Sequence, residues 1–394
     1  MKNHKRVCLV FSSILFFLLA GCWDRVEIEE RGFVLGAAID VAEEQTGDEL
    51  QLRLTTQLVV PSGIGTPASG SSSSKEPYMN ISATGHSMYT INRKLAEQTS
   101  RSPYYQHVKL LVVSEEVAAN PNLFSSLMDF FIRDHEMRRG IRVLIAQDEA
   151  KKVLEATSDT EDLPTIYIES MLENSYKNGD VLQPLRLGKI HEYLVSDQSF
   201  AIPKIHMKGD RAVYQNAAVF HDFKNKVIGT LESKDIKGLN FITGKMEGGL
   251  IKVELNEHLT TLEILRIHSN MHITAINENS VEAKVKVNVN AKVAETFSSM
   301  DIATEKNLNK LEKGAEKKVK KLILQTAEKS QNELDADVLG LGQLLKHHYY
   351  DYWKQVRTNW DQGRSIFANS DITAEVHVAI RGTGGADQTS IRGE

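Results

Sequence analysis

Strict alternation of apolar and polar positions is the strongest pattern in the chain, and it lies in the last third. From Val281 to Val293 every second residue is Val or Ala, and the residues between them are charged or carry amides. Such period-two patterning is typical of a strand with one face in the core and the other in water. The pattern returns from Ile372 to Ile380, and segments 262–267 and 271–276 are expected as further partners. We therefore predict an antiparallel sheet here.

Two long helices are predicted between these strands. The first covers about 303–332 and carries an apolar stripe with helical spacing: Leu308, Leu311, Ala315, Val319 and Leu322. The second covers about 336–358, with Leu341, Leu345, Tyr349 and Tyr352 on one side. Together with the sheet, they predict a C-terminal α+β domain over residues 258–394.

The first half of the chain alternates between strands and amphipathic helices. Apolar runs over 33–40, 107–113 and 141–146 are typical of buried strands, and residues 50–60 alternate like a half-buried strand. We expect 33–40 and 50–60 to form a hairpin across Gly47-Asp48, and Asp148 to be the N-cap of the helix after the third run. The pattern predicts an α/β domain over residues 22–195.

Two further segments complete the predicted organisation. Residues 61–77 form a loop rich in Ser and Gly, whose composition indicates a flexible connector. Residues 196–257 contain short strand patterns and one short helix, which predicts a small middle α+β domain. The expected fold class is thus α/β and α+β: three domains with mixed β-sheets packed by helices.

The first 22 residues have the form of a bacterial lipoprotein signal. Lys2, Lys5 and Arg6 precede an uncharged apolar run over 7–20, which is too short to span a bilayer as a helix. Leu19-Ala20-Gly21-Cys22 then has the form of a lipobox. We predict removal of residues 1–21 and S-diacylglyceryl modification of Cys22, with N-acylation of the new amino group as an option. The alternative is an ordinary secretory signal in which Cys22 is incidental.

Cleavage at this site changes the cysteine content and the charge. Cys8 lies in the signal, so the mature chain would have no thiol for a disulfide, a redox pair or a thiolate zinc site once Cys22 is lipidated. The net charge of −5 becomes −8, with 44 Lys and Arg against 52 Asp and Glu. An acidic protein of this kind argues against nucleic acid as the partner.

Motifs for catalysis and metal binding are missing from the sequence. It contains neither an HExxH zinc motif nor a GxSxG nucleophile elbow. Adjacent helical residues such as His347 and His348 point about 100° apart, whereas shared metal ligation favours a spacing of three or four. We therefore predict a non-enzyme without a metal or cofactor, while carboxylates paired by folding remain an open alternative.

One segment carries a concentrated positive charge. Residues 305–329 contain eight lysines and four glutamates, although the chain as a whole is acidic. A solvated helix face is one interpretation. The other is a face that contacts anionic lipid or an acidic partner, for which the candidate residues are Lys317, Lys318, Lys320 and Lys321.

Several short segments resemble the GerAC-type family, the C-subunit lipoproteins of germinant receptors in endospore formers. They occur in the family's order along nearly the whole mature chain: Cys22-Trp23-Asp24-Arg25, Glu27-Ile28, Gly32-Phe33, Leu35-Gly36, Ile39-Asp40, Ala212-Val213, Ala218-Val219-Phe220, Val227-Ile228-Gly229, Gly238-Leu239, 335–342 and 353–361. The chain departs from the family pattern after Asp361, where Gln362-Gly363 replaces an expected aromatic strand entry.

The resemblance implies a function as well as a fold. It implies a non-catalytic, three-domain protein, tethered through Cys22 to the outer face of the spore inner membrane. There it would act with integral-membrane A and B subunits in a receptor for nutrients. The alternative function is a lipid-anchored solute-binding protein of a membrane transporter, which would be expected to have two similar lobes around a ligand cleft. A surface hydrolase is a third possibility and would need a catalytic constellation formed by folding.

Overall fold

The computed structural model describes residues 27–45, 50–64, 76–255, 257–297, 301–362 and 365–382. The predicted signal, Cys22, the turn at Gly47-Asp48 and most of the Ser-rich loop lie outside these ranges. The predictions made for them therefore stay predictions.

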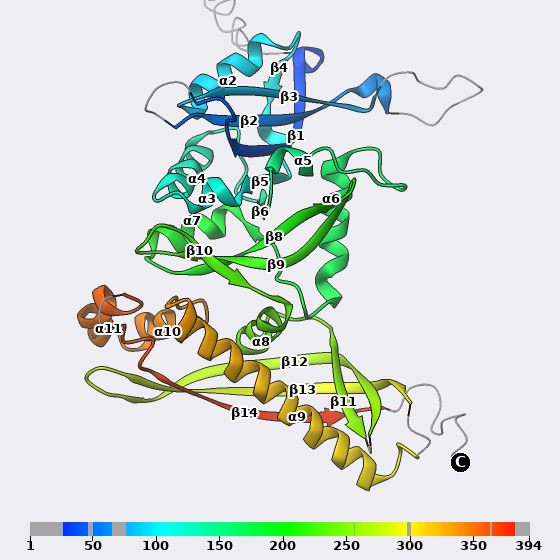
Figure 1. Cartoon of the computed structure of the whole chain (residues 1–394), viewed down its shortest axis with the longest axis vertical. Coiled ribbons are helices and arrows are strands. Elements are labelled where there is room, and N and C mark those ends of the chain that lie inside the picture. The colour runs from blue at the N-terminus through cyan, green and yellow to red at the C-terminus, as the bar shows by residue number, and fades with distance from the viewer. Residues whose placement is uncertain are drawn as a thin grey trace, which may run out of the picture.

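Within the described ranges, one mixed sheet contains ten strands (Figure 1). Its main path runs β10-β9-β8-β6-β5-β1-β2-β3, with β4 paired to β1 and β7 paired to β6. In chain order, the strands are β1 (Arg31–Val41), β2 (Leu52–Val59), β3 (Tyr78–Gly85), β4 (Ser102–Tyr104), β5 (Leu110–Ser114), β6 (Arg142–Ala146), β7 (Leu185–Arg186), β8 (Phe200–Lys208), β9 (Arg211–His221) and β10 (Lys226–Leu231).

The middle of this sheet is parallel and covered on both faces. β1, β5, β6 and β8 pair in parallel, while β2 and β3 at one side and β9 and β10 at the other pair antiparallel. In β5, Leu111 and Val113 belong to one apolar cluster and Leu110 and Val112 to the other. This two-sided burial explains the continuous apolar run in the sequence. The expected antiparallel hairpin partners 33–40 and 50–60 are confirmed by the pairing of β1 with β2.

Helices occupy both faces of the first sheet. One face packs against α2 (Met88–Glu97), α3 (Glu115–Ala119), α4 (Leu123–Arg133) and α7 (Leu187–Val195). The other packs against α5 (Ala150–Val153) and α6 (Pro164–Asn174).

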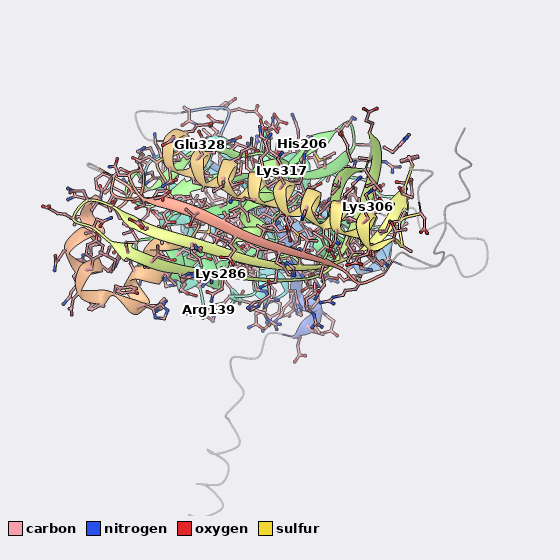
Figure 2. All side chains as sticks on the ribbon, turned by 90° about the horizontal axis from the view of Figure 1, so that it is seen from below. Arg139, His206, Lys286, Lys306, Lys317 and Glu328 are labelled. Atoms are coloured by element: carbon pink, nitrogen blue, oxygen red, sulfur yellow. The ribbon has the colours of Figure 1, made fainter. Side chains whose placement is uncertain are left out.

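The second sheet has four described strands, in the order β11-β12-β13-β14. They are β11 (Leu250–Leu255), β12 (His258–Ile276), β13 (Val281–Thr296) and β14 (Asp371–Ile380). Its apolar face packs against α8 (Ser233–Thr243), α9 (Glu305–Glu328), α10 (Leu341–His348) and α11 (Tyr350–Val356). Its other face presents polar side chains such as Lys286, as the view in Figure 2 shows. The strict alternation in β13 therefore arises as predicted, because one face of the strand lies in the core and the other is exposed.

Two details of the predicted second sheet were wrong. Segments 262–267 and 271–276 are one continuous strand, β12, whose register shifts at three irregularities along β13. At a bulge, the strand continues although the apolar alternation is interrupted. In the sequence, such an interruption looks like the end of a strand. In addition, β14 pairs with β13 in parallel, whereas the other pairs are antiparallel. The helices between β13 and β14 provide the crossover that parallel pairing requires.

The helices of the C-terminal region differ from the prediction in one respect. The sequence predicts a helix over about 303–332, and the structure has α9 followed by a π-helical turn, Lys329–Glu333. The single second helix over 336–358 was wrong, because α10 and α11 are separated at Tyr349, where φ is −137° and ψ is 52°. Apolar spacing alone does not reveal such a break, since the side chains on both pieces still face the core.

The sheet boundaries bear on the domain organisation. β8, β9 and β10 belong to the expected middle domain, 196–257, yet they are hydrogen-bonded into the same sheet as β6. β11, from the same segment, belongs to the second sheet. The three-domain division therefore remains a prediction, and what the structure displays is two sheets.

Helix α8 lies between the two sheets and contacts α9 closely (Figure 1). A Cβ atom at Gly238 would lie 2.1 Å from Thr326 Oγ1 and 2.5 Å from the carbonyl oxygen of Leu322. Thr326 Oγ1 donates to the carbonyl oxygen of Asp235 at 3.0 Å, and Lys329 Nζ pairs with the Asp235 carboxylate at 2.7 Å. Only a residue without a side chain fits between these two helices.

We predict that Gly238→Ala lowers the free energy of unfolding by about 1–3 kcal/mol, because overpacking outweighs the higher helix propensity of Ala. Urea denaturation of the mature chain measures this. Gly140→Ala is the control, since a Cβ there meets nothing within 4 Å. A Gly238 variant as stable as the control would contradict the packing argument.

Candidate functional site

Helix α9 organises the candidate interaction surface suggested by the lysine-rich segment. Thr304 caps its N-terminus by accepting a hydrogen bond from the backbone N–H of Asn307. Its buried stripe is Leu311, Ala315, Val319, Ile323 and Ala327. The predicted stripe residues Leu308 and Leu322 lie at the margins of this face and are half-buried.

All four candidate lysines are exposed, but they do not lie on a single surface. Lys317 and Lys320 line a groove of about 690 Å³ beside β14, together with Lys284 and Lys313. Lys318 lines a separate cleft, formed with α8 and β11. Figure 2 shows Lys306 and Lys317 along α9. The helical period therefore divides one run of lysines between two surfaces.

Two acidic residues of α9 contact the edge of the second sheet. Glu316 Oε1 accepts from the backbone N–H of Val378 at 3.2 Å, and Glu312 Oε1 accepts from that of Ile380 at 2.9 Å. These carboxylates cover the edge of β14, which would otherwise present free amides to other strands. The groove beside them is lined by four lysines and two glutamates, Glu316 and Glu375, so lysine is in excess there.

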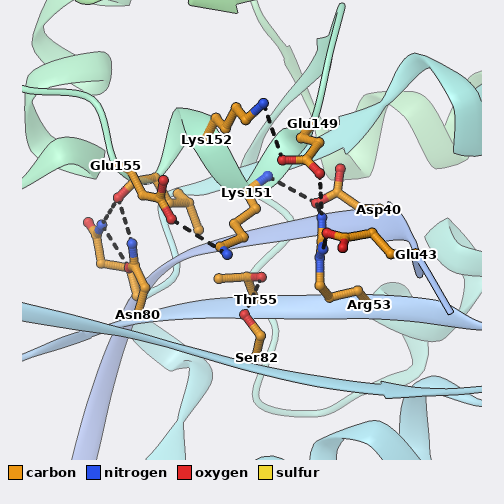
Figure 3. A network of polar contacts seen from close by, with 12 residues as sticks. Asp40, Glu43, Arg53, Thr55, Asn80, Ser82, Glu149, Lys151, Lys152 and Glu155 are labelled. Atoms are coloured by element: carbon orange, nitrogen blue, oxygen red, sulfur yellow. Dashed lines mark hydrogen bonds and ion pairs between the residues drawn. The ribbon is translucent and has the colours of Figure 1, made fainter. Parts of the chain in front are cut away.

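A second polar cluster joins β1, β2 and α5 (Figure 3). Asp40 accepts from the backbone N–H groups of Ala150 at 2.6 Å and Lys151 at 3.0 Å. Arg53 lies 3.6 Å from Asp40 and 3.3 Å from Glu149. Burial raises the pKa of Asp40, and the two backbone donors and Arg53 oppose this rise. The cluster caps a helix and ties strands together, which is a structural role.

The expected N-cap of that helix was wrong. α5 begins at Ala150, and its N-cap residue Glu149 makes no side-chain capping bond. The cap comes instead from Asp40, which is 110 residues away in the sequence.

Several carboxylates meet near the junction of the two sheets. A cavity of about 210 Å³ lies there, lined by Asp197, Ser199, Asp337 and Asp361 among others. Burial raises the pKa of Asp222 to about 7, and the neighbouring Asp197 and Asp361 add to the rise. Burial also raises the pKa of Asp337, which accepts from the backbone N–H groups of residues 340–342 and from Trp360 Nε1. The sequence alone allowed for carboxylates paired by folding, but it did not indicate which residues would meet.

The polar groups here do not form a nucleophilic triad. Ser199 Oγ donates to Asp361 at 2.7 Å and accepts from the backbone N–H of Asp222 at 3.2 Å. His221 Nε2 lies 3.1 Å from the backbone carbonyl oxygen of Asp361, and no described hydrogen bond joins His221 to Ser199. A serine nucleophile needs direct contact with its base.

Histidines at the end of α10 are placed as surface residues. His347 and His348 are both exposed in the last turn of the helix. Across the described ranges, no group of three His, Cys, Asp or Glu side chains is arranged to hold a metal ion.

The titration of Asp222 generates a prediction. Because the folded-state pKa of about 7 lies above the usual 3.8, the folded chain retains a proton that the unfolded chain releases. Asp222 therefore stabilises the fold at low pH, and this contribution is lost as the pH rises toward 7. We expect Asp222→Asn to raise the free energy of unfolding at pH 8 by about 1–2 kcal/mol, after allowance for solvent screening.

Urea denaturation between pH 5 and 8 checks the Asp222 prediction, and the variant should show a weaker pH dependence than the parent chain. Asp148→Asn is the control at an exposed position. Equal pH slopes in the parent and Asp222→Asn chains would rule out the raised pKa.

Comparison with known proteins assigns both parts of the chain to one family. Residues 24–207 match the family described as "Spore germination protein N-terminal domain". Residues 215–384 match "Spore germination B3/ GerAC like, C-terminal".

Similar proteins and one solved structure agree with these matches. Spore germination protein YndF of Bacillus subtilis (strain 168) is 29% identical, with 94% of this chain and 95% of that protein covered. Spore germination protein A3 of the same organism is 29% identical, with 95% and 98% covered. The crystal structure of the GerBC protein aligns with a TM-score of 0.60 at 22% identity, covering 87% of this chain and 97% of that one, which shows the shared fold. The chain belongs to the GerAC-type family of spore germination proteins.

Proposed function

We propose that the mature chain is the lipid-anchored, non-catalytic C subunit of a nutrient germinant receptor. It would act with integral-membrane A and B subunits on the outer face of the spore inner membrane. The observation that carries the proposal is the match to both family regions over nearly the whole chain, directly after a lipobox that ends at Cys22.

The anchor would supply the attachment to the membrane. Among the described residues, no helix is both long and apolar enough to cross a bilayer. Each acyl methylene buried in the membrane contributes about 0.8 kcal/mol, and two chains suffice for stable anchoring. Confinement to a surface raises the effective concentration near membrane partners, so a modest interface would be sufficient.

The arrangement of the molecule favours a protein partner over lipid for the lysines of α9. The first described residues lie at one end of the long axis, and α9 with the second sheet lies at the other (Figure 1). Five residues lie between Cys22 and Ile28, so the two can be at most about 22 Å apart when the chain is extended. If Cys22 is in the membrane, the groove lined by Lys317 and Lys320 lies toward the end of the molecule that is away from the lipid. It would then meet an acidic surface of another subunit.

The other two functions are less well supported. A solute-binding protein was expected to have two similar lobes, whereas the two sheets here differ in size and topology. Hydrolysis through Ser199 would need a base beside it, and His221 contacts the backbone of Asp361 instead. These observations favour the non-catalytic subunit.

We predict that Cys22→Ala releases a folded protein from the membrane and impairs nutrient-triggered germination, because the anchor is lost. Membrane fractionation and the loss of spore optical density after nutrient addition measure the two effects. Circular dichroism should be unchanged from the parent chain. Full membrane retention with normal germination would contradict the anchored-subunit proposal.

We predict that reversing the four lysines to Glu at 317, 318, 320 and 321 lowers recovery of the A and B subunits by about fivefold or more, since rim charges control encounter with a charged partner. The measurement is affinity purification from detergent-solubilised spore inner membrane, with partners identified by mass spectrometry. The control carries the same charge change on the first-sheet half, at Lys94, Lys152, Lys189 and Lys224. Equal recovery with both variants would exclude these four lysines from the contact with the A and B subunits.

A further inference from the structure

A lysine-lined cleft of about 660 Å³ opens where four elements meet. These are the turn that follows α6, the start of α8, the start of β11 and the middle of α9. Each contributes cations: Lys177 from the turn, Lys234 and Lys237 from α8, Lys252 from β11 and Lys318 from α9. Among the described lining residues, Asp180 is the one acid. Five lysines from four elements of an acidic protein are not explained by composition.

The walls of the cleft are held in place by the fold. Asn240 Nδ2 donates to the carbonyl oxygens of Gly179 at 3.0 Å and Val181 at 2.9 Å, which fixes the turn after α6 against α8. Gly249, with φ +136°, brings the start of β11 against the same turn, so that a Cβ atom there would lie 3.2 Å from Gly179 N. Such a preformed cleft can bind a ligand at little conformational cost.

Local ion pairs neutralise only part of the charge. Lys237 Nζ pairs with Asp180 at 2.7 Å, and Lys234 Nζ lies 3.4 Å from Glu232. Lys252 and Lys318 form no ion pair with a residue that the structure describes. Their like charges face one cleft, and a bound anion would relieve the repulsion.

Beside the polar Asn178 and Ser233, the lining has an apolar part. Leu250, Ile251 and Leu322 contribute to it, and Leu250 is 44% exposed. An ammonium group is a compact charge with three rotatable donors, which suits the tetrahedral oxygens of a phosphate approached from several sides. We propose that this cleft binds a small phosphate-bearing anion whose organic part is apolar.

The phosphate could belong to a free molecule or to a lipid headgroup. If Cys22 anchors the chain, as proposed above, the second-sheet end lies away from the bilayer (Figure 1). This argument rests on the proposed anchor and favours the free molecule. The binding itself does not depend on it.

The test uses the mature chain with Cys22→Ala, which cannot be lipidated, so that vesicle binding does not arise from the anchor. Phenyl phosphate and inorganic phosphate are titrated by calorimetry at low ionic strength. Vesicles of phosphatidylglycerol, with phosphatidylcholine as the neutral reference, test the lipid source. A double variant, Lys252→Glu with Lys318→Glu (the cleft pair), reverses two charges in the cleft. A matched double variant, Lys313→Glu with Lys317→Glu (the groove pair), makes the same change in net charge in the groove on the other side of α9.

We expect saturable binding of phenyl phosphate at one site, tighter than inorganic phosphate. The cleft pair should raise its Kd by about tenfold or more, and the groove pair by less than about threefold. Binding only to phosphatidylglycerol vesicles, lost selectively in the cleft pair, would assign the phosphate to a lipid. Absence of binding to every probe, or equal losses in the two pairs, would overturn the proposal. Circular dichroism and thermal unfolding verify that both variants fold.

Discussion

The close contact between α8 and α9 at Gly238 is the constraint on which the rest of the structure depends. α8 follows the last strand of the first sheet, and α9 covers the second sheet, so their contact connects the two. The apolar cluster around it combines Ala201 of the first matched region, together with Val219 and Leu231, from the first sheet with the inner face of the second. The two regions that match separate family descriptions therefore share one core. A change in one should be felt in the other, because a packed core transmits strain.

Helix α9 assigns its side chains to four tasks according to their angle around the axis. Its apolar stripe fills the core, while Glu312 and Glu316 cover the edge of β14. Lysines on one flank line the groove beside β14, and Lys318 on the other flank lines the cleft with α8 and β11. The edge of β14 provides backbone donors for two of the acids of the helix. On both of these surfaces lysines outnumber acids.

Patterns that act locally were readable from the sequence, and contacts between distant segments were not. The alternation in β13 and the buried run in β5 predicted strands correctly, because each depends on which faces are covered. The continuity of β12 was missed, since bulges preserve pairing where the apolar period breaks. The cap that Asp40 gives to α5 and the acids around Asp222 join segments far apart in sequence. The positive charge of the lysine run is likewise visible in the sequence. How this charge is divided between two surfaces depends on which elements flank the helix, and the sequence does not indicate that.

The positions of the surfaces limit how a receptor subunit of this shape could work. An anchor at Cys22 would hold the end of the molecule where β1 begins, while the groove and the cleft lie toward the second-sheet end. Because one apolar core joins the two sheets, contacts made at the second-sheet end could reach the other end through packed side chains. An anion bound between α8, β11 and α9 would contact the same helices that form this junction. Its binding free energy would add to the packing that holds the two sheets together. Ligand binding and the stability of the junction would thus be linked.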